Sequence, residues 1–225
     1  MGTRRVVSAV LLATAAVTLA YYHQVDNRLR PADRVAIAAY FAAVGYSPPA
    51  SLESYALQLA YIRAVQQAVL HCATGNDGIP QGFPREPADL LRRGSGLCYD
   101  RSRVIEKMLR FGGLQTRHCA LYHRAAGASA LQTLIDPHSD SHAVTEVRTS
   151  AGWLVVDSNE AWLSLDCGGR PQPIAAVHTW QRPLPAFYRQ PFVCVYGLYS
   201  RHGRFYPPYN AVPDLHWPEL LANVW

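Results

Sequence analysis

The stretch GSGLCYD, Gly94–Asp100, places a cysteine between a flexible Gly-Ser-Gly turn and a run with helical periodicity. From Tyr99 to Phe111 the apolar residues recur at near-helical spacing, and a pair of glycines follows as a stop signal. The pattern predicts that Cys98 lies in the first turn of a helix. Unpaired backbone N–H groups and the positive end of the helix dipole favour the nucleophilic thiolate at such a position. Alternatively, Cys98 is a small buried residue of the core.

The chain has 225 residues, of which 49% are hydrophobic and 16% charged. This composition suits one folded domain of ordinary or slightly large size with a substantial core. The formal net charge of +5 comes almost entirely from arginine, because Lys107 is the only lysine. Since the arginines are scattered rather than clustered, the sequence predicts no nucleic-acid partner.

The N-terminus has a short basic region, Arg4-Arg5, followed by an uncharged and largely apolar run from Val6 to Tyr22. This order is typical of an export signal or a membrane anchor, although the run is at the lower limit for spanning a bilayer. We expect residues 1–30 to form an uncleaved anchor or a signal segment, with the membrane as a partner. The folded domain is then expected outside the cytoplasm, either periplasmic or extracellular, and is secreted if the segment is cleaved.

The cysteines are odd in number, at positions 72, 98, 119, 167 and 194. In an oxidising compartment four of them can pair in disulfides and leave one thiol. We expect Cys98 to be the remaining thiol, and the sequence leaves the pairing of the other four open.

Two helices are predicted before the Cys98 turn, one over residues 31–44 and a longer one from Ser51 to Val69. Ser51 is expected to cap the second helix, whose apolar stripe is most simply a core face. A loop over residues 73–87 follows, and a short helical turn begins at Pro87.

Past Gly113 the periodicity changes from helical to strand-like. Strands are predicted over residues 115–122, 131–135, 142–148, 153–157 and 192–199. The third and fourth of these form a good hairpin candidate, because only a short turn separates them.

The hairpin permits a geometric prediction. If Arg148 pairs with Trp153, then Val144 lies opposite Asp157, and His142 lies on the same face and diagonal to that aspartate. A carboxylate there can hold the imidazole in the tautomer that accepts a proton from a thiol. A slip of one residue would place the two side chains on opposite faces.

From Gly168 onward the chain is rich in proline and aromatic residues. It is predicted to form an extended wrap whose aromatic side chains cover apolar surface, and the alternative is that they line a groove for peptide or sugar. These aromatic residues are Trp180, Tyr188, Tyr206, Tyr209 and Trp217.

Four segments in this order resemble the core of the transglutaminase-like superfamily, the papain-related cysteine enzymes, over about residues 50 to 165. They are Gly-x-Cys98 opening a helix, GLQTR ending at Arg117, SHAVTEV starting at Ser141, and GWLVVD ending at Asp157. The resemblance implies an α+β fold in which N-terminal helices, with the nucleophile at a helix N-terminus, pack on an antiparallel β-sheet. One departure is Val144, where family members commonly have an aromatic residue.

The resemblance implies Cys98 as the nucleophile, His142 as general base and acid, and Asp157 as the orienting carboxylate, with no cofactor. The expected reaction is thiol-mediated hydrolysis or acyl transfer at an amide of a peptide or protein substrate, either a peptide bond or a glutamine side chain. We expect residues 31–168 to form the catalytic core with its leading helices. Residues 169–225 are expected to form an extension that packs on this core.

Two alternatives compete with the cysteine enzyme. The segment Asp136–His142 alternates aspartate and histidine, and further candidate zinc ligands lie near it in sequence: His118, Cys119 and His123. Against a metal site, one short turn rarely supplies all the ligands, and such residues are ordinary loop formers. The other alternative is a non-catalytic binding or scaffold module at the cell envelope, that is, a domain of this type that has lost its activity. The presence of all three residues of the expected triad argues against this alternative.

Overall fold

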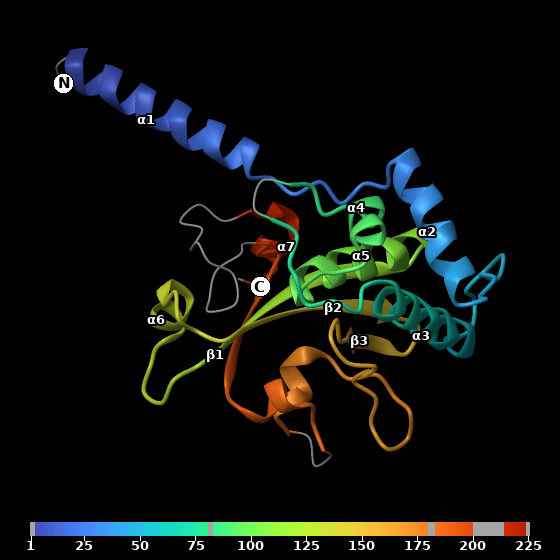
Figure 1. The fold of residues 1–225 in the computed structure, drawn as a ribbon. Helices are drawn as coiled ribbons and strands as arrows, with labels where there is room; N and C mark the ends of the chain where they lie inside the picture. The colour runs from blue at the N-terminus through green and yellow to red at the C-terminus, as the bar shows by residue number, and fades with distance from the viewer. Residues whose placement is uncertain (1–2, 81–82, 180–182, 200–213, 224–225) are drawn as a thin grey trace.

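A four-stranded antiparallel sheet in the order β3-β2-β1-β4 lies at the centre of the computed structural model, which describes residues 3–80, 83–179, 183–199 and 214–223 (Figure 1). Its strands are β1 (Gln115–His123), β2 (Ser141–Thr149), β3 (Gly152–Val156) and β4 (Phe192–Tyr196). The α-helices are α1 (Thr3–Tyr22), α2 (Pro31–Ala43), α3 (Tyr55–Cys72), α4 (Pro87–Arg93), α5 (Cys98–Phe111), α6 (Ala130–Ile135) and α7 (Trp217–Leu221). Two 3₁₀ helices, η1 (Ile174–Thr179) and η2 (Ala186–Arg189), precede β4. The predicted α+β fold is confirmed.

Helix α5 begins at Cys98, as predicted, and a buried aspartate fixes its first turn. The Asp100 carboxylate accepts hydrogen bonds from the backbone N–H groups of Leu97, at 3.0 Å, and Ile79, at 3.1 Å. It also pairs with Arg85, whose Nε lies 3.0 Å from Oδ1. The start of the helix is therefore tied to the loop before α4 as well as to its own backbone.

The sheet is covered on both faces. One face contributes Val147, Leu154 and Val156 to the core that it shares with the helices, which include α3 and α5. The opposite face packs against the segment that contains η1 and η2, drawn in orange in Figure 1. Because β3 is covered on both sides, its sequence is a continuous run of apolar residues and does not alternate between apolar and polar side chains.

The hairpin of β2 and β3 has the predicted register. Arg148 pairs with Trp153, and Thr145 pairs with Val156 at the other end of β3. The next residue, Asp157, therefore reaches the face of the sheet that also carries His142.

Two sequence predictions about local structure are wrong. Helix α3 begins at Tyr55 rather than near Ser51, because the hydroxyl of Ser54 caps it by accepting a hydrogen bond from the backbone of Leu57, at 3.2 Å. Since Ser51 and Ser54 stand three positions apart before the same apolar stripe, the sequence alone does not separate them.

The predicted strand over residues 131–135 is helix α6. Ser129 and Gln132 form a reciprocal capping box, with backbone-to-side-chain distances of 3.2 Å and 2.8 Å. Leu131 and Ile135 are 68% and 59% exposed. Only Leu134 of this apolar run packs against the β1 residues Ala120 and Tyr122. The alternation expected of a buried strand is therefore absent, and the local capping signal determines the conformation.

Helix α1 extends away from the rest of the molecule, with apolar side chains such as Leu11, Leu12 and Val17 exposed (Figure 1). Within the part of the chain that the structure describes, no helix has the length and apolarity needed to cross a membrane. The predicted membrane-spanning anchor is therefore not supported.

The only lysine of the chain lies at the centre of a buried cluster of charges. Lys107 on α5 is fully buried, and its Nζ lies 2.8 Å from Asp33 Oδ2 on α2 and also contacts Glu86 at the start of α4. Arg103, one turn earlier, contacts Glu86 at 3.6 Å. These pairs hold α2 and α4 against the helix that begins with Cys98.

Replacement of Lys107 by methionine should lower the free energy of unfolding by about 3–5 kcal/mol, because it leaves the buried Asp33 without its lysine partner and Glu86 with Arg103 alone. Urea unfolding of the wild type and the variant measures this difference. The control is Arg148→Met, at an exposed position, which should change stability by no more than about 0.5 kcal/mol. Equal effects of the two substitutions would show that the buried pairs contribute little.

Candidate active site

The structure brings together the three side chains that the sequence analysis selected. His142, near the start of β2, places Nε2 at 2.9 Å from Oδ2 of Asp157, the residue that follows β3. The side chain of Cys98, at the first position of α5, hydrogen-bonds the same imidazole. All three are buried, with exposed fractions of 8% for Cys98, 6% for His142 and 1% for Asp157.

Four donors surround the Asp157 carboxylate. Oδ1 accepts hydrogen bonds from the backbone N–H groups of Asn159, at 2.7 Å, and Glu160, at 2.8 Å. Oδ2 accepts one from His142 and one from the hydroxyl of Tyr188, at 2.5 Å. Burial works against ionisation, but these donors together with the charge of His142 lower the pKa of Asp157 below its usual value.

The same contacts favour the charged form of the imidazole. Burial opposes that form, but the charge and hydrogen bond of Asp157, followed by those of Cys98, raise the pKa of His142 to about 10. At neutral pH the ring is therefore an imidazolium held between a carboxylate and a thiol. Such a cation beside a cysteine stabilises the thiolate, which is the nucleophilic form.

A pocket of about 460 Å³ opens at these residues. Its wall comes from four parts of the chain: the loops before α5, the start of β2, the loop after β3, and the segment that contains η2. Besides the three central residues, its lining consists of Asn76, Leu97, Ser141, Asn159, Glu160, Pro185, Phe187 and Tyr188. An acyl group can therefore approach Cys98 through a pocket with mixed apolar and polar walls.

Tyr188 and Phe187 are site residues that the sequence analysis did not identify as such. It named Tyr188 only as an aromatic that covers apolar surface, and the structure shows that it does so while also bonding Asp157. The only sequence signal was the clustering of aromatic residues near Pro185. Of the other aromatics named there, Trp217 begins α7 and is 37% exposed, whereas Trp180, Tyr206 and Tyr209 lie outside the described residues.

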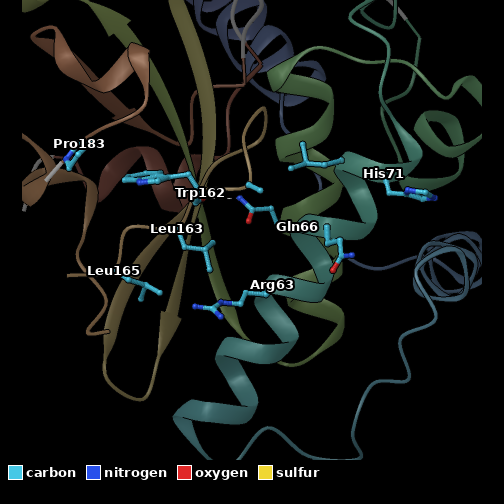
Figure 2. Close-up of a pocket in the computed structure, with 10 residues that line it drawn as sticks. Arg63, Gln66, His71, Trp162, Leu163, Leu165 and Pro183 are labelled. Carbon is cyan, nitrogen blue, oxygen red and sulfur yellow. Dashed lines mark hydrogen bonds between the residues drawn. The ribbon is translucent and has the colours of Figure 1, made fainter. Parts of the chain in front are cut away.

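A second pocket, of about 950 Å³, is lined by residues of α3 and of the segment that follows Asp157. Figure 2 shows Arg63 and Gln66 of α3 on one wall and Trp162 on the other. The buried amide of Gln66 donates hydrogen bonds to the carbonyl oxygens of Asp157, at 2.8 Å, Glu160, at 3.0 Å, and Trp162, at 2.8 Å. Gln66 therefore fixes the backbone of the loop that carries the site's carboxylate.

The alternative metal site is not supported by the placement of its residues. His142 turns toward Asp157, whereas Asp136 and His138 are exposed. Within the described ranges, no group of three or more histidine, cysteine, aspartate or glutamate side chains is arranged to hold a metal ion.

No disulfide joins the five cysteines, all of which lie within the described residues. The pairing that the sequence permits is therefore not formed in this structure. Cys167 is exposed and Cys119 is fully buried, so the five thiols differ widely in access to solvent.

An α+β domain with a cysteine at a helix start and a histidine–aspartate pair on adjacent strands is a domain of the cysteine-enzyme type. Residues 51–158 match the model of the transglutaminase-like superfamily. The chain therefore carries a domain of this superfamily, as the sequence pattern predicted.

One solved structure, from Parabacteroides distasonis and provisionally described as a protease, is similar to this chain at 14% sequence identity and a TM-score of 0.29. The match covers 56% of this chain and 30% of that protein, so this chain spans less than a third of that protein's length. No curated protein matches the chain.

The pair of His142 and Asp157 should make stability depend on pH. Because the pKa of His142 is raised from 6.5 to about 10, its contribution is complete below pH 6.5 and is lost as the pH rises toward 10. Because the pKa of Asp157 is lowered, its contribution is present above about pH 4 and is lost in acid. The stability difference between wild type and His142→Gln should thus be largest between about pH 4 and pH 6.5.

Urea unfolding at pH 5, pH 7 and pH 9.5 measures this difference. The control is His138→Gln, which replaces an exposed histidine on the loop before β2, outside the buried pair. A stability loss in His142→Gln that stays constant from pH 5 to pH 9.5 would contradict the assignment of a charged, paired imidazole.

Proposed function

We propose that this protein is a cysteine-dependent enzyme that hydrolyses an amide or transfers its acyl group, with Cys98 as the nucleophile. His142 acts as the general base and acid, and Asp157 orients it. The observation that carries the proposal is the buried His142–Asp157 pair, 2.9 Å apart, with Cys98 bonded to the same ring in a domain of the transglutaminase-like superfamily. The substrate class that suits this chemistry is a peptide or protein.

The reaction follows from the charges of the site. The Cys98 sulfur forms a bond with the amide carbon, and the carbonyl oxygen becomes an oxyanion near the start of α5, where backbone N–H groups can stabilise it. The carbon–nitrogen bond then breaks while His142 gives its proton to the departing amine, which leaves a thioester on Cys98. Water or another amine attacks the thioester as His142 takes up its proton, and the acid or new amide is released with the thiolate restored.

The proposal extends to location. The basic-then-apolar order of the first residues supports export, so the domain is proposed to act outside the cytoplasm. Export stays a prediction, and it is independent of the chemistry of the site.

Cys98 should react with iodoacetamide about tenfold or more faster than Cys167 at pH 7, although Cys167 is the more exposed thiol. The nucleophilic form of a thiol is the thiolate, and an imidazolium in hydrogen-bond contact, as His142 is with Cys98, favours that form. Peptide mass spectrometry after short labelling times gives both rates in one sample. His142→Gln should abolish the advantage of Cys98 and leave the rate of Cys167 unchanged.

Equal labelling of Cys98 and Cys167 in the native protein would count against the nucleophile. Such a result would favour the non-catalytic binding module instead.

A glutamine-containing peptide, incubated with and without a primary amine, distinguishes the possible reactions. Hydrolysis of a peptide bond gives two fragments, hydrolysis of the side chain releases ammonia, and transfer joins the added amine to the peptide. Each product should disappear in Cys98→Ser, because a hydroxyl is a far weaker nucleophile than a thiolate at neutral pH. Equal product from wild type and Cys98→Ser would contradict the assignment of Cys98, and chromatography with mass detection measures the products.

A further inference from the structure

The hydroxyl of Tyr188 occupies a position between the C-terminal segment and the active-site carboxylate. Tyr188 is 2% exposed, and its oxygen lies 2.5 Å from Oδ2 of Asp157, the same oxygen that accepts from His142. Tyr188 belongs to η2, which lies outside the part of the chain that matches the transglutaminase-like model. A segment beyond residues 51–158 thus contributes a direct contact to the central pair of the matched domain.

The ring of Tyr188 is held by its neighbours. Trp162, from the loop after β3, packs against it with ring centroids 4.7 Å apart. The preceding residue, Phe187, stacks on His123 of β1 at 4.0 Å, and its carbonyl accepts a hydrogen bond from His123 Nε2 at 2.9 Å. The hydroxyl therefore reaches Asp157 from a side chain whose position is fixed by the sheet and by the loop.

The two oxygens of Asp157 are held in different ways. Oδ1 is fixed by two backbone N–H groups of its own loop, whereas Oδ2 depends on two side chains, His142 and Tyr188. A buried carboxylate that loses a donor is stabilised less in its charged form. The charge of Asp157 holds the imidazolium beside Cys98. The loss of a hydrogen bond to Oδ2 should therefore also change the reactivity of the thiol.

The titratable groups that face the Tyr188 ring are few. Asp157 is in direct hydrogen-bond contact, and the His142 ring lies edge-on to the tyrosine with ring centroids 6.1 Å apart. Glu160 of the same loop and Cys119 of β1 act on Tyr188 only electrostatically. Burial, followed by the charge of Asp157, raises the pKa of Tyr188 well above its usual value. The hydroxyl consequently stays protonated and acts only as a donor over the whole pH range of the proposed reaction.

We propose that Tyr188 is a positioning residue of the active site, which acts on Cys98 through Asp157 and His142. The inference rests on the proposed function of these three residues. It makes the C-terminal segment a working part of the site rather than only a cover for apolar surface.

Tyr188→Phe in the full chain tests this proposal, because it removes the hydroxyl and keeps the ring. The readout is the rate of Cys98 alkylation by iodoacetamide from pH 4 to pH 9. We expect the acid limb of this profile to move up by about one pH unit, with about a tenfold lower rate on that limb and little change near pH 8. The cause is that Asp157 takes up a proton at higher pH once it has lost a donor, and His142 then loses its counter-ion.

The matched control is Tyr61→Phe. The hydroxyl of Tyr61 is also buried and donates a hydrogen bond, of 2.6 Å, to the Met108 carbonyl in the helical core. Its loss should lower stability and leave the pH profile of Cys98 unchanged. Thermal unfolding of both variants separates stability from the titration of the site.

A double-mutant comparison tests whether Tyr188 acts through the carboxylate. In an Asp157→Asn background, Tyr188→Phe should have no further effect on the acid limb. The proposal is overturned if Tyr188→Phe leaves the wild-type profile unchanged, or if it moves the acid limb equally with and without the Asp157 carboxylate. Failure of the proposed function looks different, because the wild-type Cys98 would then react no faster than Cys167.

Discussion

The hydrogen bond between His142 and Asp157 is the interaction on which the site depends, and the pairing of β2 with β3 sets it. In the observed register Arg148 lies opposite Trp153. The side chains of His142 and Asp157 therefore reach the same face of the sheet. A shift by one residue would send one of them to the opposite face. Because the two faces of the sheet pack against different parts of the chain, such a shift would also exchange the apolar residues between two separate cores. Hydrophobic packing therefore protects the geometry of the pair.

Burial makes each polar group of this centre dependent on its partners. Asp157 is almost fully buried, and four donors stabilise its charge. The same principle applies at the other side of α5, where Lys107 neutralises carboxylates from α2 and α4. The helix that begins with Cys98 is thus held by compensated charges on one side and by apolar packing on the sheet on the other. Both constraints act on the position of the thiol.

Features of this fold that depend on residues close together in the sequence were predictable, whereas contacts between distant segments were not. Helix α5, the hairpin and its register were predictable, because periodicity and a short turn encode them over a few residues. The start of α3 and the conformation of residues 130–135 were mispredicted, since competing serine caps and a local capping box determine them. The contact of Tyr188 with Asp157 could not be predicted, because it joins residues from segments without a shared pattern.

By itself, the sequence determined which residues have the chemistry of a cysteine enzyme and in which order they occur, because these properties belong to residue types and to local periodicity. Only the tertiary structure decided that Cys98, His142 and Asp157 meet at one pocket, and that the segment between β3 and β4 contributes Tyr188 to its wall. The physical reason is that burial and hydrogen bonding between distant segments depend on how the sheet is covered on its second face. That packing is a property of the whole chain, and no local pattern encodes it.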